Sequence, residues 1–110
     1  MSGARRKFMR LLVFLDLPVK TQQDRRVSTL FRKFLIGNGY DMLQYSVYGR
    51  IVNGYDAEEK HLNRLKCHLP SKGTVRPLTV TEKQFADMKI LVGNPSFQEK
   101  TVQPVQLSLF

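Results

Sequence analysis

Cysteine, tryptophan and acidic residues are scarce in this sequence, and the shortage of cysteine already excludes several kinds of protein. Among 110 residues there is one cysteine, Cys67, and there is no tryptophan. A single cysteine cannot form an internal disulfide, and its spacing from His61 and His68 does not fit a metal site. We therefore expect a cytoplasmic protein without a zinc module.

Long apolar runs are also missing. No uninterrupted apolar stretch approaches the roughly 20 residues that a membrane-spanning helix needs. Binding to an anionic membrane surface would call for a basic amphipathic helix with large exposed apolar side chains. We expect no membrane partner.

The shortage of acids leaves a strong positive charge. Nine Asp and Glu stand against eighteen Lys and Arg, which gives a formal net charge of +9. An excess of this size favours a polyanionic partner, because binding releases condensed counterions. Nucleic acid is the first candidate. No recognition helix or exposed aromatic platform is evident, so binding should depend on salt and not on base sequence.

Apolar periodicity predicts two amphipathic helices. The first should follow Thr21, which forms a capping box with Asp24, and should end at Gly37–Gly39. Its apolar stripe consists of Val27, Leu30, Phe31, Phe34 and Leu35. The second should be capped by Asp56 and end at Pro70, with Leu62, Leu65 and Leu69 on its apolar side. Thr81 and Gln84 bracket a further short helical turn.

Strand patterns alternate with these helices. We expect strands over 8–15, 41–52, 73–80 and 88–93, the second being one long strand or two strands kinked near Gly49, and a last short strand in VQLSLF. The order predicts an α+β fold, a ferredoxin-like βαββαβ sandwich over residues 1–93. Residues 94–110 should form a loop and an additional C-terminal strand, which could pack on a partner subunit.

Two helices can cover only one face of such a sheet. The first strand is apolar on both faces, so the uncovered face should meet a second copy of the chain, giving a homodimer. In the strand 41–52, Tyr45 should face the core with Leu43 and Val47. Tyr48 should be freer, at the dimer interface.

One carboxylate, Asp16, stands at the end of the first strand, in LLVFLDLP (11–18). A buried lone charge is costly, so Asp16 is a turn former, a capping residue or a ligand for something positive. Cations follow it on the first helix and recur later in the chain. Those expected to contact phosphates are Lys20, Arg25, Arg26, Lys33 and Arg50. A merely solvated helix face is the alternative for this set.

Four runs together resemble a known family: LLVFLDLP, DRRVSTLFRKFLIGNGY (24–40), LQYSVYGRIV (43–52) and GTVRPLTVTEKQF (73–85). They are similar to the CRISPR-associated protein two family, the small adaptation subunit, and most to the versions that accompany type II systems. The resemblance implies a ferredoxin-like homodimer that bridges two integrase dimers. In that place it would hold pre-spacer duplex DNA during spacer acquisition.

The same resemblance implies a different, enzymatic function. Many proteins similar to this chain are described as Mg²⁺-dependent endonucleases acting on RNA or DNA. Carried over, the metal ligand and catalytic residue is Asp16. Since Mg²⁺ needs only one or two carboxylates with waters and phosphates, two Asp16 side chains meeting across a dimer axis would suffice.

The segment QLSLF raises one more possibility. It looks like the peptide with which bacterial polymerases and repair proteins dock on the DNA sliding clamp, through Gln106, Leu107, Leu109 and Phe110. The alternative is a terminal strand that pairs with the sheet of the partner subunit and buries Val105, Leu107 and Leu109. The sequence leaves both open.

Overall fold

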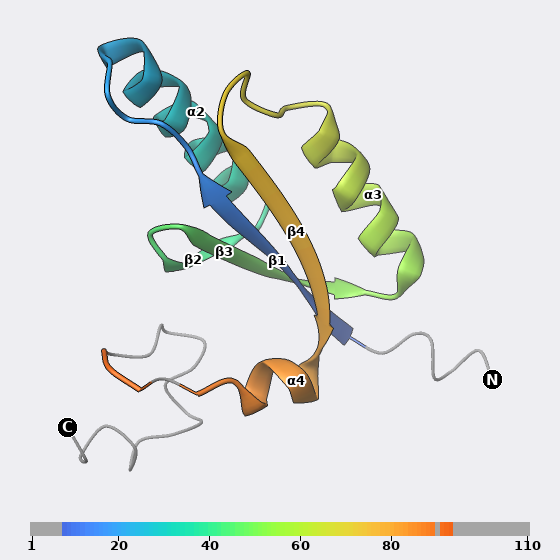
Figure 1. Ribbon diagram of the computed structural model, residues 1–110. Helices are drawn as coiled ribbons and strands as arrows, with labels where there is room; N and C mark the ends of the chain where they lie inside the picture. The colour runs from blue at the N-terminus through green and yellow to red at the C-terminus, as the bar shows by residue number, and fades with distance from the viewer. Residues whose placement is uncertain (1–7, 90, 94–110) are drawn as a thin grey trace.

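The computed structural model describes residues 8–89 and 91–93, and within them the chain forms one antiparallel sheet and three helices (Figure 1). In chain order the elements are β1 (Phe8–Asp16), α2 (Gln22–Gly37), β2 (Asp41–Gln44), β3 (Val47–Asn53), α3 (Tyr55–Lys66), β4 (Thr74–Thr81) and α4 (Glu82–Asp87). The strand order is β2-β3-β1-β4. This α+β arrangement agrees with the ferredoxin-like sandwich that the sequence predicted.

β1 is one of the two inner strands, and its side chains alternate between the two faces of the sheet. It pairs antiparallel with β3 on one side and with β4 on the other. Leu11, Val13 and Leu15 join Phe31 and Leu35 in the core beneath α2 and α3, which lie together on one face (Figure 1). The alternate residues of β1 therefore point to the opposite face. We call that opposite side the open face.

α2 begins with the predicted capping box. The Thr21 hydroxyl accepts from the backbone N–H of Asp24, and the Asp24 carboxylate accepts from the backbone N–H of Thr21. Phe31 and Leu35 are buried as expected. Leu30 is not: it lies on the outer side of the helix, since its position in the turn is offset from the buried residues.

The segment 41–53 corrects two predictions. It forms the two strands of a hairpin, β2 and β3, but they are divided by a turn at Tyr45 and Ser46 and not near Gly49, which lies within β3. Tyr45 is consequently 65% exposed and Tyr48 only 3% exposed, the reverse of the expectation. The turn removes Tyr45 from the strand alternation, and β3 then points Tyr48 toward the helices. Gly49 instead lies under Leu12, because a Cβ there would come 3.0 Å from the Leu12 side chain.

α3 starts and ends differently from its prediction. Its N-cap is Gly54, with φ +92°, and it has no side-chain cap, so Asp56 lies in the first turn and not at the cap. An acidic residue there still favours the helix through its dipole. The helix ends at Lys66, before Pro70, and leaves Leu69 exposed.

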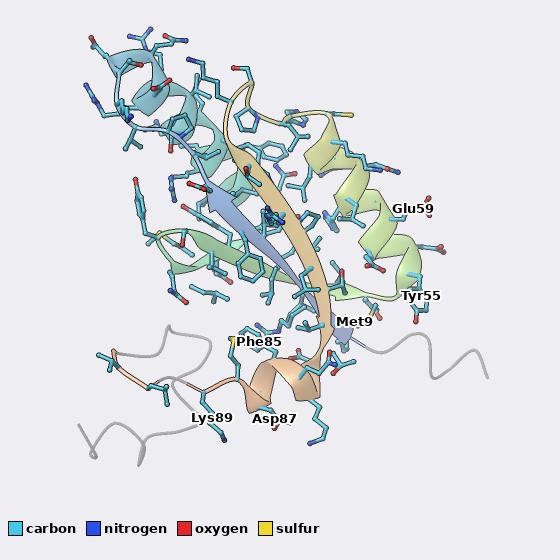
Figure 2. All side chains as sticks on the ribbon, viewed as in Figure 1. Met9, Tyr55, Glu59, Phe85, Asp87 and Lys89 are labelled. Carbon is cyan, nitrogen blue, oxygen red and sulfur yellow. The ribbon has the colours of Figure 1, made fainter. Side chains whose placement is uncertain are left out.

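The predicted strand 88–93 is not formed by its described residues. α4 follows β4 directly, capped by Thr81 and Gln84, and Phe85 packs inward (Figure 2). Residues 88, 89 and 91–93 then run irregularly past the open face and do not pair along a sheet edge. Apolar composition suggested a strand, but a strand needs a neighbouring backbone for its hydrogen bonds. The predicted C-terminal strand lies outside the described residues.

No helix in the described part of the chain is long and apolar enough to cross a membrane.

Candidate functional site

Asp16 is held at the junction of β1 and α2 by a close backbone contact. A Cβ on Gly73 would come 2.6 Å from the Asp16 carbonyl oxygen, and Gly73 has φ +89°. The loop before β4 therefore fits against the end of β1 only because residue 73 is glycine. This contact fixes the backbone from which the Asp16 side chain projects.

The Asp16 carboxylate itself is exposed. By the alternation of β1 it lies on the open face, like Leu12 and Phe14. Within residues 8–89 and 91–93 it makes no hydrogen bond or ion pair, so the donors that a capping or turn-forming role requires are not found there. An exposed carboxylate of this kind suits the binding of a cation.

Asp16 suits a magnesium ion whose other ligands are mostly water and phosphate oxygens. Among the described residues no three His, Cys, Asp or Glu side chains come together to hold a metal. Asp16 is therefore not part of a three-residue cluster of such ligands within these ranges. Mg²⁺ commonly takes one or two protein carboxylates and completes its octahedron with water and phosphate oxygens, so Asp16 suits this hard cation and not a closed zinc site.

The predicted cations after Asp16 fall into two groups on α2. Lys20 and Arg25 lie at its start, where Arg25 Nη1 donates to the carbonyls of Val19 and Lys20 at 3.1 and 3.3 Å. Arg26 and Lys33 are exposed and are separated by about two helical turns, so they share the outer side. The structure thus brings four of the five predicted cations to one helix and the loop before it.

The fifth, Arg50, lies elsewhere and has structural contacts. It projects from β3 toward the helices, where its Nη1 donates to the carbonyl of Asn38, just after α2. Arg64 of α3 donates to Asn38 Oδ1 at 2.9 Å. α2 has no basic residue in its last turn, and these two arginines supply positive charge at that end. A phosphate contact by Arg50 stays a prediction.

Two further cations were not singled out from the sequence. Lys72 lies 3.8 Å from Asp24 Oδ1, beside the start of α2. Arg76 is the cross-strand neighbour of Phe14 and therefore lies on the open face, the same face as Asp16. Only the pairing of β1 with β4 reveals this proximity, because 60 positions of sequence separate Asp16 and Arg76.

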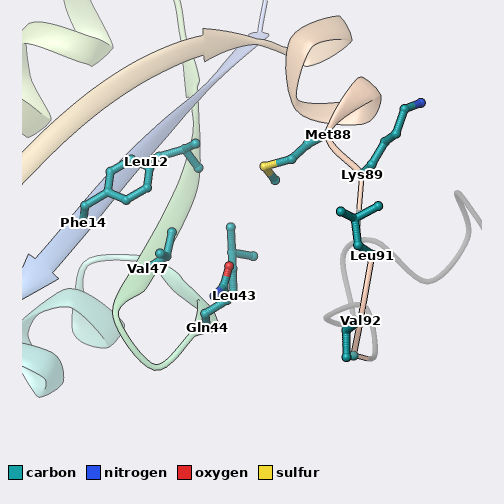
Figure 3. A pocket seen from close by; sticks show the side chains of 10 residues that line it. Leu12, Phe14, Leu43, Gln44, Val47, Met88, Lys89, Leu91 and Val92 are labelled. Atoms are coloured by element: carbon teal, nitrogen blue, oxygen red, sulfur yellow. The ribbon is translucent and has the colours of Figure 1, made fainter. Parts of the chain in front are cut away.

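The open face is apolar as well as charged. Phe14 and Leu78 are exposed on it. A groove lies between the hairpin and the segment after α4 (Figure 3), and its lining includes Leu12, Phe14, Leu43, Val47 and Met88. Such contiguous apolar surface on a small protein indicates an interaction surface.

Fold and site together define a class: small basic ferredoxin-like proteins with one exposed carboxylate at the end of the first strand and cations on the helix that follows. The particular family is shown by comparison. Residues 9–88 match the family model described as CRISPR associated protein Cas2, so the chain belongs to the Cas2 family.

Three relatives align with this chain over most of their own lengths. A protein of Acidovorax ebreus named CRISPR-associated endoribonuclease Cas2 is 64% identical over 93% of this chain and 100% of its own length. A protein of Campylobacter jejuni with the same name is 42% identical over 94% of this chain and 73% of its own length. A third, from Ligilactobacillus salivarius, is 46% identical over 77% of this chain and 84% of its own.

Proposed function

We propose that this protein is the small adaptation subunit of a CRISPR system and acts in the cytoplasm. As a homodimer it binds pre-spacer duplex DNA between two integrase dimers, without reading sequence. Membership in the Cas2 family supports a role in a CRISPR system. The positively charged outer side of α2 supports duplex DNA as the ligand. That side presents Arg26 and Lys33 to solvent, with Lys20 and Arg25 at the start of the helix.

The positive charges on α2 suit a nucleic acid that is recognised through its phosphate backbone. Phosphates are identical in every duplex, so contacts to them give affinity without sequence preference. A subunit that must accept any foreign DNA requires this property. Two copies of a chain of formal charge +9 also form a strongly positive particle for a short duplex.

Dimerisation is proposed through the open face. α2 and α3 cover one side of the sheet and leave Phe14 and Leu78 of the other exposed. A second copy would bury this apolar surface and bring two Asp16 carboxylates toward a common axis. The face that lacks a helical layer is therefore the natural contact between subunits.

A second candidate is nuclease activity at Asp16. The names of the relatives describe endoribonucleases, and the Asp16 carboxylate is free of partners among the described residues. When bound, Mg²⁺ would stabilise charge on a phosphodiester and its leaving oxygen. Asp16 would hold the ion, two copies supplying two carboxylates, and the nearby cations would position an RNA or DNA backbone.

Comparing wild type with Asp16→Asn separates the two candidates. Two assays on one preparation are needed: RNA and DNA cleavage with Mg²⁺ or EDTA, and integration of a duplex with the partner integrase. We expect integration to persist in Asp16→Asn, because the proposed bridge relies on cations and not on this carboxylate. Asp56→Asn, an exposed carboxylate on α3, is the matched control.

The outcomes differ clearly. Cleavage that needs Mg²⁺, survives in Asp56→Asn and disappears in Asp16→Asn assigns a catalytic ligand to Asp16. Wild-type protein that neither binds duplex nor supports integration would overturn the adaptation role.

The segment QLSLF supports one further proposal, docking on the DNA sliding clamp through Gln106, Leu107, Leu109 and Phe110. Its basis is the likeness of these residues to clamp-binding peptides. A peptide of residues 105–110 should bind purified clamp and should lose binding when Leu107 and Phe110 become Ala. Absence of binding by the unaltered peptide would end this proposal.

A further inference from the structure

The turn between β2 and β3 carries a large aromatic residue that the turn does not need. Turns of this kind favour Gly, Asn, Asp or Ser, whose conformations or side chains support the reversal. Here Tyr45 occupies the turn and is 65% exposed. The hairpin lies at the edge of the sheet, away from β4 (Figure 1). Neither core packing nor turn chemistry accounts for a tyrosine there.

Arg32 of α2 fixes the orientation of this ring. Its guanidinium carbon lies 3.7 Å from the centroid of the Tyr45 ring, a cation–π contact. The same guanidinium donates to Ser28 Oγ at 3.1 Å, to the Tyr48 hydroxyl at 3.3 Å and to the Tyr45 carbonyl. One face of the ring is thus covered by a group that the helix and β3 both anchor. Tyr45 remains 65% exposed in spite of this contact.

The surroundings of the ring are positive on the helix side. Lys33 is exposed next to Arg32, and both line a shallow depression on α2 together with Thr29, Ile36 and Gly37. A ligand that stacks on Tyr45 would therefore pass close to Lys33, an exposed cation suited to phosphate. An aromatic surface beside such cations is the combination with which proteins hold single-stranded nucleic acid.

We propose that Tyr45 is a stacking platform for one unpaired nucleobase. The inference rests on the proposed function, because it adds to a duplex ligand the requirement for an unpaired end or strand. Stacking tolerates every base, since each has a π-face, and so preserves binding without sequence choice. Arg32 holds the ring before the ligand arrives, which lowers the entropy lost on binding.

The test uses DNA duplexes that carry 2-aminopurine as the first unpaired base of a short overhang, with blunt duplexes of the same sequence for comparison. Stacking quenches the fluorescence of this base. Wild type should quench it and bind the overhang duplex about tenfold more tightly than the blunt one. Tyr45→Phe should retain both effects, and Tyr45→Ala should lose both. Tyr55→Ala, which removes another exposed tyrosine, should change neither.

Tyr45→Leu is the control for loss of folding in Tyr45→Ala. Leucine keeps apolar bulk beside Arg32 but has no π-face. This variant should behave like Tyr45→Ala while melting like wild type. Equal binding of overhang and blunt duplexes by wild type, or quenching that persists in Tyr45→Leu, would overturn the platform and leave duplex binding intact. Failure to bind any duplex would instead contradict the proposed function. RNA overhangs in a parallel series show whether the platform distinguishes the sugar.

Discussion

At the scale of single residues, Tyr40 carries a buried hydroxyl without a hydrogen-bond partner in the part of the chain that the structure describes. Burial raises the pKa of its phenol to about 12, although the nearby Arg50 and Arg64 guanidiniums act in the opposite direction. His61 presents a comparable case: its buried Nδ1 also lacks a partner there, and burial, followed by Arg50, Arg64 and Lys60, lowers its pKa. Both atoms bear a desolvation cost.

Replacing Tyr40 by Phe should therefore raise the free energy of unfolding at pH 7, by about 1 kcal/mol, because the unpaired hydroxyl is removed and the ring stays. The pH dependence has a defined sign. An unfolded phenol ionises near pH 10, whereas the folded one stays neutral to about 12. Ionisation therefore favours the unfolded state, and the free energy of unfolding of the wild type falls as pH rises between those values. Tyr40→Phe should not show that fall.

Urea unfolding at pH 7 and pH 11 measures both effects, with Tyr55→Phe as the control on an exposed ring. A Tyr40→Phe protein that is markedly less stable at pH 7 would mean that the hydroxyl has a partner.

At the scale of elements, α2 combines a core side with a charged outer side. Phe31 and Leu35 pack under it, while Arg26 and Lys33 lie about 10 Å apart along its outer side. Because the two functions occupy different sides of one helix, the outer side can be altered without disturbing the core.

Lys33→Gln should reduce the slope of log binding constant against log salt for duplex DNA by about 0.9 for each phosphate that the protein no longer neutralises. Unfolding should be unchanged within about 0.5 kcal/mol, as for other exposed positions. Titrations at several salt concentrations give the slope, and Lys60→Gln on α3 is the matched control. Equal slopes for Lys33→Gln and Lys60→Gln would place the DNA away from α2.

Local patterns predicted some elements better than others. β1, α2 and α4 were predicted because apolar periodicity and capping boxes are local signals. The hairpin was predicted less well, since its turn at Tyr45 and Ser46 has neither Gly nor Asn to mark it. For the site, the position of Asp16 at the end of an apolar strand drew attention to it, and the family resemblance supplied its expected role as a metal ligand. The contacts of Arg50 with Asn38 and of Arg32 with Tyr45 depend on tertiary packing, which single-sequence patterns do not contain.

At the scale of the whole molecule, the two faces of the sheet are unequal. One is covered by α2 and α3, and the other exposes apolar and charged side chains together. Arg10 illustrates the difference. It pairs with Glu82 at 3.1 Å and lies 4.4 Å from the Phe85 ring centroid, so α4 covers one end of the open face and leaves the rest uncovered.

Leu78→Glu should therefore convert the proposed homodimer to a monomer, because it places a carboxylate opposite Leu12 in the middle of the open face. Sedimentation or light scattering measures the mass. Leu69→Glu is a matched control, since Leu69 is 51% exposed and Leu78 52%, but it follows α3 on the other side. A Leu78→Glu protein that keeps the mass of the wild type would exclude the open face as the subunit contact.

The position of β1 in the sheet has a consequence for synthesis on the ribosome. β1 is made first, yet one of its two neighbours, β4, ends at Thr81. At roughly 5–20 residues per second, several seconds pass in which the nascent chain holds an inner strand with one side unpaired. Native folding cannot finish before β4 has left the exit tunnel, and until then the edge of β1 that β4 will pair with stays without its partner.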